Sequence, residues 1–226
     1  MGSRDSDFRG VLPLVQFDHL DRTDAMLAVI DYRTGNLTSV LKALNYLGAK
    51  TCVTQSPEDI RKASKIVLPG VGHFQATTLL RELGINEAVR EGVDKGAWFL
   101  GICVGLQWLF EGSTEAPGVA GRGQFAGVCE RFPALFEGAE LKSPHVGWNS
   151  LERVRTDSRL LRGVKDGFVY YTHSWRAPVV AATAAVTEYG GPFTAVVERD
   201  NVMGVQFHPE KSSAVGLQVL KNFVEL

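Results

Sequence analysis

The chain has 226 residues, 45% of them hydrophobic and 22% charged, and its formal net charge is −1. This length allows one large domain or two small ones with a full buried core. The near-neutral charge gives no electrostatic reason to expect nucleic acid or an anionic membrane as a partner, and no apolar run approaches the length of a membrane span.

Cysteine usage points to a reducing compartment. The three cysteines, Cys52, Cys103 and Cys129, are odd in number and lack the spacing of a zinc site or a disulfide framework. Unpaired thiols suit the cytoplasm, so we expect a cytoplasmic protein without a metal centre.

The N-terminal segment differs from the rest of the chain. Residues 1–25 are polar, mixed in charge and without sustained periodicity, so we expect a disordered N-terminal extension with Met26 as a natural start. Residues 26–226 contain no repeat, low-complexity stretch or long linker, and we expect them to form a single domain.

After residue 26, strand and helix patterns alternate. Short apolar runs predict strands, and spacings of three and four predict the helices between them. The predicted strands of this half are 27–30, 51–54, 65–68 and 97–100, and the predicted helices begin near 37, 56, 75 and 104. This alternation is typical of a parallel sheet covered by helices on both faces.

The second half of the chain is richer in strands. Predicted strands lie at 125–132, 146–154, 168–175, 181–187, 193–198 and 202–207, and a closing amphipathic helix lies at 214–226. Scarce helices favour antiparallel pairing. The expected fold is therefore α/β: three layers, with a mostly parallel central sheet, helices on both faces and an antiparallel extension.

The first candidate for chemistry is Cys103, which lies between a predicted strand and a predicted helix in the segment GICVG. The G-x-C-x-G form is that of a nucleophile elbow, in which a tight turn needs glycine on both sides of the nucleophile. The N-terminus of the following helix favours a thiolate, the reactive form. The alternative is that Cys103 is a small buried hydrophobic residue, because such short patterns recur by chance.

A second element lies about a hundred residues downstream. His208 stands at the end of the predicted strand 202–207, and Glu210 follows two residues later. If the chain stays extended through Pro209, the carboxylate can reach the far imidazole nitrogen. Cysteine, histidine and carboxylate would then form a triad in its cysteine form.

The segment PGVG at 69–72 suggests the oxyanion donors that such a triad needs. One backbone N–H would come from Val104, directly after the nucleophile, and the other from Gly72. The alternative for this segment is a plain turn, since Pro-Gly is a common turn signal.

These motifs together resemble the class I (triad) glutamine amidotransferases. The resemblance rests on GICVGLQ at 101–107 with HPE at 208–210. Finer matches are similar to the glutaminase subunits of imidazole glycerol phosphate synthases, which belong to histidine biosynthesis. These matches are DY at 31–32 with GNL at 35–37, PGVGHF at 69–74, EAPGV at 115–119, HVGWN at 145–149, YYTHS at 170–174 and HPEKS at 208–212.

The resemblance implies that Cys103 attacks the side-chain amide of glutamine, releasing ammonia and leaving a thioester that water hydrolyses to glutamate. It implies His208 as general base and acid and Glu210 as the group that orients it. The N–H groups of Val104 and Gly72 are implied as the oxyanion hole. The positions that match glutamine-binding residues are Gln107, Glu115, His173, Ser174 and Trp175. No cofactor is implied.

The resemblance also implies a partner, a (β/α)₈-barrel cyclase subunit that forms a heterodimer with this chain. The cyclase would use the ammonia to make imidazole glycerol phosphate and an aminoimidazole carboxamide ribotide. Positions that match residues facing the cyclase or signalling to it are Asn36, Ser39, His145, Tyr170 and Lys211. The alternative for Lys211 is an exposed charge, and for Tyr170 a core aromatic residue. Arg33-Thr34 and Trp175 depart from the residues usual in the family, which bears on interface details.

Three other functions stay open from the sequence. The chain could serve another ammonia-using synthase, such as an anthranilate, carbamoyl phosphate, GMP or pyridoxal phosphate synthase. It could be a stand-alone γ-glutamyl cysteine hydrolase, with the same triad on a different amide. It could also be a catalytically silent subunit that only regulates a cyclase, although all three triad members are present.

Overall fold

The structure is a computed structural model that describes residues 26–33, 37–153, 155–164 and 167–226. The predicted N-terminal extension and the predicted interface residue Asn36 lie outside the described residues.

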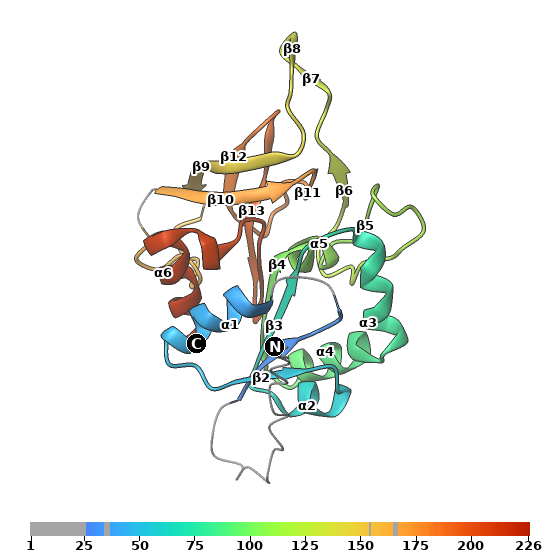
Figure 1. The fold of residues 1–226 in the computed structure, drawn as a ribbon, viewed down its shortest axis with the longest axis vertical. Helices are drawn as coiled ribbons and strands as arrows, with labels where there is room; N and C mark the ends of the chain where they lie inside the picture. Colours follow the sequence, from blue (N-terminus) through green and yellow to red (C-terminus); the bar gives the residue numbers. More distant parts are fainter. Residues whose placement is uncertain (1–25, 34–36, 154, 165–166) are drawn as a thin grey trace, which may run out of the picture.

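A nine-stranded sheet runs through the molecule in the order β10-β9-β12-β13-β14-β4-β3-β1-β2 (Figure 1). Five neighbouring strands are parallel, namely β2 (Thr51–Thr54), β1 (Leu27–Ile30), β3 (Lys65–Gly70), β4 (Trp98–Cys103) and β14 (Val202–Val205). The four that follow are antiparallel, namely β13 (Pro192–Arg199), β12 (Thr183–Glu188), β9 (His145–Arg153) and β10 (Gly167–His173). The predicted sheet with its antiparallel extension is confirmed.

Helices cover both faces of the parallel strands, as predicted. On one face α1 (Leu37–Tyr46) packs beside α6 (Ser213–Val224), and on the other α2 (Pro57–Lys62) and α3 (Thr78–Glu82) pack against α4 (Ile85–Asp94) (Figure 1). This double cover explains the continuous apolar runs, because every residue of β1 and β14 is buried. None of the helices in the described ranges is long and apolar enough to cross a membrane.

Local sequence signals account for several element ends. Ser56 caps α2, with its hydroxyl accepting a hydrogen bond from the N–H of Asp59 at 3.4 Å, and Pro57 occupies the first helical position. Gly48, with φ +80°, lies just beyond α1 and lets the chain turn back into β2. Strands β1 and β2 have the predicted bounds.

Smaller elements lie beside the main sheet. Strand β11 (Trp175–Arg176) pairs with β6 (Val128–Arg131), which pairs with β5 (Gly112–Ser113). A hairpin of β7 (Leu135–Phe136) and β8 (Ala139–Glu140) projects from the body (Figure 1). The sequence did not predict this hairpin; its turn residues Glu137 and Gly138 both have positive φ, which is typical of a two-residue hairpin turn.

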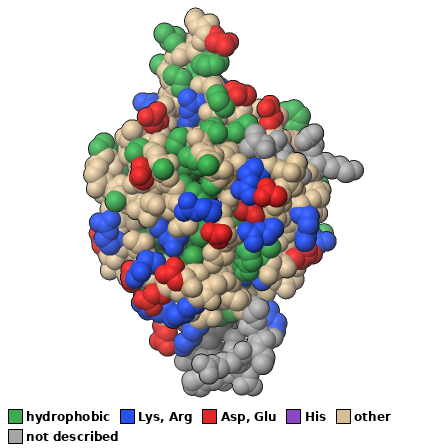
Figure 2. Space-filling model, turned by 180° about the vertical axis from the view of Figure 1, so that it is seen from behind, with side chains coloured by type: hydrophobic (Ala, Val, Ile, Leu, Met, Phe, Trp, Pro, Cys, Tyr) green, Lys and Arg blue, Asp and Glu red, His purple; other side chains and the backbone are tan. Residues whose placement is uncertain are grey.

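Charged side chains of both signs lie near one another on the face seen in Figure 2, where Lys and Arg are interspersed with Asp and Glu. This agrees with the net charge of −1.

Candidate active site

Cys103 lies at the turn between β4 and α5 (Val104–Trp108), and its backbone is strained, with φ 54° and ψ −108°. A non-glycine residue rarely adopts positive φ, and such strain is characteristic of a nucleophile elbow. The neighbouring glycines are required, because a Cβ on Gly101 would overlap the backbone of Gly105 and one on Gly105 would overlap the carbonyl of Leu68. The predicted elbow geometry is therefore present.

His208 follows β14, the strand directly beside β4, and begins the short 3₁₀ helix η2 (Pro209–Lys211). Its Nδ1 lies 3.0 Å from Oε1 of Glu210, and both side chains are almost fully buried. The backbone of His208 is anchored to β10, since its N–H donates to the carbonyl of Tyr170 at 2.9 Å. Its own carbonyl accepts from the hydroxyl of Ser212 at 2.6 Å. The structure thus places the imidazole between the carboxylate and the elbow.

Electrostatics at His208 favour the imidazolium. Burial alone would lower the pKa of this imidazole, but the adjacent Cys103 sulfur and Glu210 carboxylate outweigh it and raise the pKa above its usual value. Within the described residues, Nε2 of His208 is buried and has no hydrogen-bond partner. This nitrogen is therefore available for proton exchange with a group in the adjoining cavity.

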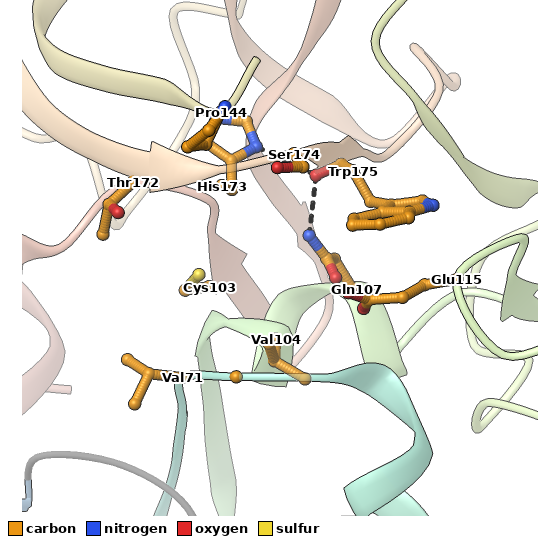
Figure 3. A pocket seen from close by; sticks show the side chains of 11 residues that line it. Val71, Cys103, Val104, Gln107, Glu115, Pro144, Thr172, His173, Ser174 and Trp175 are labelled. Atoms are coloured by element: carbon orange, nitrogen blue, oxygen red, sulfur yellow. Dashed lines mark hydrogen bonds between the residues drawn. The ribbon is translucent and has the colours of Figure 1, made fainter.

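A cavity of about 250 Å³ opens in front of the elbow. Figure 3 shows Cys103 and Val104 on one side of it and His173, Ser174 and Trp175 on the other. Its lining residues are Val71, Gly72, Cys103, Val104, Gln107, Glu115, Pro144, Thr172, His173, Ser174 and Trp175. The structure therefore brings all seven predicted substrate-binding residues to one cavity with the predicted nucleophile.

Glu115 connects this cavity to the glycine-rich segment after β3. Its Oε2 accepts a hydrogen bond from the N–H of Phe74 at 2.8 Å. Gly72, in the same segment, has φ +103° and no atom within 4 Å of where a Cβ would stand. The acidic side chain and the glycine thus both line the cavity, and a hydrogen bond ties the acidic side chain to the segment that contains the glycine.

Two predicted substrate-binding side chains have their polar nitrogens committed within the protein. The amide nitrogen of Gln107 donates to the carbonyl of Trp175 at 2.8 Å and to Oε1 of Gln206 at 3.2 Å. His173 uses Nδ1 for the carbonyl of Trp175 at 2.9 Å and Nε2 for His145 at 3.3 Å. These two side chains shape the cavity wall, and only the backbone of His173 is left to meet a ligand.

The side chain of His145, which the sequence predicts to face a partner or to signal to it, does not lie on the surface. His145 is 4% exposed, and its ring packs between Tyr171 and Tyr189. Side chains alternate along a strand, so the inward position of His145 turns its neighbours outward. Val146 and Trp148 are accordingly 55% and 52% exposed.

The other predicted interface residues lie on or near the surface. Tyr170 is half-buried on β10, and the amine of Lys211 lies 5.9 Å from its ring centre. Ser39 is half-buried on α1. Tyr170 is directly opposite Trp148 in the β9–β10 ladder, with ring centres 6.0 Å apart.

Sequence reasoning missed two features. Gln206 is fully buried and donates from Nε2 to the sulfur of Cys103 at 3.7 Å. Its signal was a lone amide in an apolar strand just before His208. The second is an exposed apolar surface, here the outer strip, made of Val146, Trp148, Phe168 and Tyr170 on β9 and β10; its signal was alternation in HVGWN.

A strained cysteine elbow beside a histidine–carboxylate pair, on a sheet of this topology, defines a class of cysteine amidases. The family model described as "Glutamine amidotransferase class-I" matches residues 28–226. The solved structure described as "Crystal structure of glutamine amidotransferase" is 19% identical, with a TM-score of 0.67, and covers 88% of this chain and 99% of that chain. The chain belongs to the class-I glutamine amidotransferase family.

Curated relatives show which members of this family the chain resembles in sequence. "Imidazole glycerol phosphate synthase subunit HisH" of Halalkalibacterium halodurans is 42% identical over 202 residues, covering 88% of this chain and 94% of the relative. The protein of the same name in Deinococcus radiodurans is 46% identical over 199 residues, covering 86% and 91%. Within the class-I amidotransferases, the chain therefore groups with the HisH subunits.

Proposed function

We propose that this chain is the glutaminase subunit of an imidazole glycerol phosphate synthase and supplies ammonia for histidine biosynthesis. The observation that carries the proposal is the meeting of Cys103, His208 and Glu210 at the carboxyl ends of two adjacent parallel strands, beside a cavity. The similarity to HisH subunits over most of the chain supports the choice of this synthase.

In the proposed reaction the sulfur of Cys103 attacks the side-chain carbonyl of glutamine. His208 transfers a proton from Nε2 to the departing nitrogen, so ammonia leaves as the thioester forms. Water then attacks the thioester, with His208 as base, and glutamate leaves. Glu210 holds the Nδ1–H of His208 and compensates the charge that the imidazole carries between these steps.

The oxyanion of each tetrahedral intermediate would be bound by backbone N–H groups of Val104 and Gly72, which line the cavity beside the sulfur. Glutamine itself is a zwitterion. Glu115 is the acidic residue of the cavity lining and suits the α-ammonium, while the backbone of residues 173–175 suits the α-carboxylate. Gln107, His173, Ser174 and Trp175 would complete the wall against which the substrate lies.

For the partner we propose a (β/α)₈-barrel cyclase that docks on the outer strip. Val146, Trp148 and Phe168 are each more than half exposed, which is unusual for three apolar residues on adjacent strands. Thr172, which lines the cavity, pairs directly with Val146 in the ladder, so the outer strip begins at a residue that is the direct cross-strand neighbour of the cavity wall. Ser39, Tyr170 and Lys211 would contribute polar contacts around this strip.

We also place the protein in the cytoplasm. All three cysteines are free thiols in the structure, and Cys103 must stay reduced to act as a nucleophile.

The experiment that tests the proposal is covalent trapping with a glutamine-like diazo ketone, followed by mapping of the modified residue. We expect one label on Cys103, which lines the cavity, none on Cys129, which does not, and protection by excess glutamine. Ammonia release from glutamine should then rise when cyclase is added to unmodified protein. Labelling that ignores Cys103, or ammonia release that no cyclase can support, would contradict the proposed function.

A further inference from the structure

Two buried histidines on the antiparallel half of the sheet form a direct pair. His145 and His173 stand opposite each other at the end of the β9–β10 ladder and are 4% and 7% exposed. Nδ1 of His145 lies 3.3 Å from Nε2 of His173. The reaction described above gives neither ring a chemical step.

The partners of this pair fix where each proton lies. A carbonyl can only accept, so Nδ1 of His173 donates to the oxygen of Trp175, at 2.9 Å. In a neutral ring Nε2 of His173 is then the acceptor, and Nδ1 of His145 must donate to it. The remaining nitrogen, Nε2 of His145, accepts from the amide of Asn149 at 3.3 Å.

Asn149 cannot turn its amide over without loss. Its Nδ2 also donates to the carbonyl of Glu188 at 3.0 Å, and its Oδ1 accepts from the N–H of Ser150 at 2.8 Å. If either histidine gained a proton, two N–H donors would face each other with no acceptor between them. The hydrogen-bond chain is complete only when both rings are neutral.

The surroundings of the pair also disfavour charge. The ring of His145 stacks between Tyr171 and Tyr189, with centroids 4.9 and 3.9 Å away. Phe132 packs against both histidines. Burial lowers the pKa of His145 to about 4. Burial, helped by the nearby charges of His145, His208 and Arg176 and opposed by the hydrogen bond to Trp175, lowers the pKa of His173 to about 3.

The chain of hydrogen bonds ends at the cavity. The carbonyl of Trp175 accepts from His173 and also from the amide of Gln107. Gln107 donates in turn to Gln206, whose Nε2 donates to the sulfur of Cys103 at 3.7 Å. The histidine pair and the nucleophile are therefore connected through one backbone oxygen in the cavity wall. Figure 3 draws the bond from Gln107 to this oxygen.

We propose that His145 and His173 are positioning residues of the glutamine site, which as a neutral pair fix the carbonyl of Trp175 and with it the wall formed by residues 172–175. The inference rests on the proposed function for the identity of the ligand. In this proposal the side chain of His145 lies on the face of β9 toward the glutamine site. The pair affects glutamine binding by holding the carbonyl oxygen of Trp175 in place.

Two amide variants of His173, each of which replaces one ring nitrogen, separate this role from general packing. In His173→Asn the amide nitrogen replaces Nδ1 and can still donate to Trp175, whereas in His173→Gln the amide replaces Nε2 and that donor is lost. In the complex with cyclase we expect His173→Gln to raise KM for glutamine about tenfold and His173→Asn to stay within about twofold of wild type, since a lost buried hydrogen bond costs about 1–3 kcal/mol. The value of kcat should change much less than KM in both.

Variants of His145 give a second, independent readout. His145→Asn keeps a donor toward His173 and should stay within about threefold of the wild-type KM, while His145→Leu should resemble His173→Gln. The matched control is Glu152→Gln, an exposed position on the same strand, with unchanged KM. Equal KM values for the Asn and Gln variants of His173 would overturn the proposal, whether or not His145→Leu folds.

A measurement without turnover keeps this inference separate from the proposed function. Two-bond ¹⁵N–¹H correlation spectra of wild-type protein should show both rings as the less common Nδ1–H tautomer at neutral pH. The Nε2–H tautomer in either ring would overturn the inference even in an active enzyme. Failure of the wild-type complex to hydrolyse glutamine would instead contradict the proposed function, and the tautomers would still decide whether the pair is neutral and aligned as inferred.

Discussion

Two groups of histidines near one cavity have opposite electrostatics. On the parallel half of the sheet His208 has a carboxylate 3.0 Å from Nδ1, and the Cys103 sulfur and this carboxylate raise its pKa. On the antiparallel half, His173 has a carbonyl 2.9 Å from the same ring atom, and burial lowers its pKa. Both rings are buried to a similar degree, at 2% and 7% exposure.

The difference shows that burial alone does not decide what a histidine can do. A carboxylate stabilises the imidazolium, so His208 can hold a proton during amide cleavage. A carbonyl only orients the neutral ring, so His173 and His145 suit a fixed hydrogen-bond chain. The two groups of histidines near the cavity thus have different tasks, proton transfer for His208 and alignment for His145 and His173.

The largest expected effect comes from removing the nucleophile on the parallel side. Cys103→Ala should lower glutamine-dependent synthesis by at least about 10⁴-fold, because no other group can form the thioester. Synthesis from added ammonium should persist, since under the proposed function free ammonia bypasses the glutaminase step. Paired assays with glutamine and with ammonium check this, and Cys52→Ala on β2 is the matched control. Loss of both activities would point to a folding defect.

Removing the carboxylate of Glu210 should lower the pKa of His208, as is the case for His145 and His173. Glu210→Gln leaves the size of the side chain but removes its charge, and we expect kcat for glutamine hydrolysis to fall about 10³-fold. The pKa of His208 is higher in the folded protein than in the unfolded chain, where it is near 6.5, so protonation of this ring stabilises the fold. This contribution to the free energy of unfolding is complete below about pH 6.5 and is lost as the pH rises toward the pKa of the folded state. The variant should therefore lose less stability than wild type between pH 7 and 10 in denaturant titrations. An unchanged kcat would contradict the claim that the carboxylate of Glu210 distinguishes His208 from the neutral histidine pair.

The histidine pair on the antiparallel half of the sheet should make the protein less stable in acid. In the unfolded chain these histidines bind protons near pH 6.5, whereas in the folded protein the pair stays neutral at that pH. The unfolded state therefore binds more protons in acid, and the free energy of unfolding falls as the pH drops from about 7 to 4. With the pKa of His145 lowered to about 4, this residue alone accounts for about 3 kcal/mol of that loss. His145→Asn should remove this part of the acid sensitivity. Parallel pH profiles for variant and wild type would contradict the account.

The smallest effect on the glutamine site should come from the outer strip, on the opposite side of β9 from His145. Trp148→Ala should weaken binding of the cyclase about 10- to 100-fold, because a half-exposed tryptophan is a typical anchor of an interface. Titration of the cyclase measures this Kd, with Val179→Ala, an exposed apolar position outside the strip, as control. The tautomers of His145 and His173 should be unchanged. Unaltered affinity would remove Trp148 from the interface.

Much of this architecture could be predicted from local sequence. Strands β1 and β2 were bounded correctly because each is a short apolar or β-branched run flanked by turn residues. The elbow was predictable because Gly101 and Gly105 face backbone atoms only a few residues away or on the adjacent strand. Sites built from strand ends leave this kind of signal.

The histidine pair could not be predicted in the same way. The rings that enclose His145 come from Tyr171 on β10, Tyr189 after β12 and Phe132 after β6, so its burial depends on contacts between distant segments. In the sequence His145 is a polar residue predicted to face the partner or to signal to it, and nothing there indicates that its ring is enclosed. The hairpin β7–β8 was missed because its two short strands, with Leu135 and Phe136 exposed, do not alternate in polarity.

The most direct test of the central claim is a pH titration of the ring nitrogens by ¹⁵N NMR, with the signals of His145, His173 and His208 assigned by single substitutions. The account predicts that His208 is still protonated at pH 8, while His145 and His173 are both neutral at pH 5. Titration of all three rings together near pH 6.5 would contradict it.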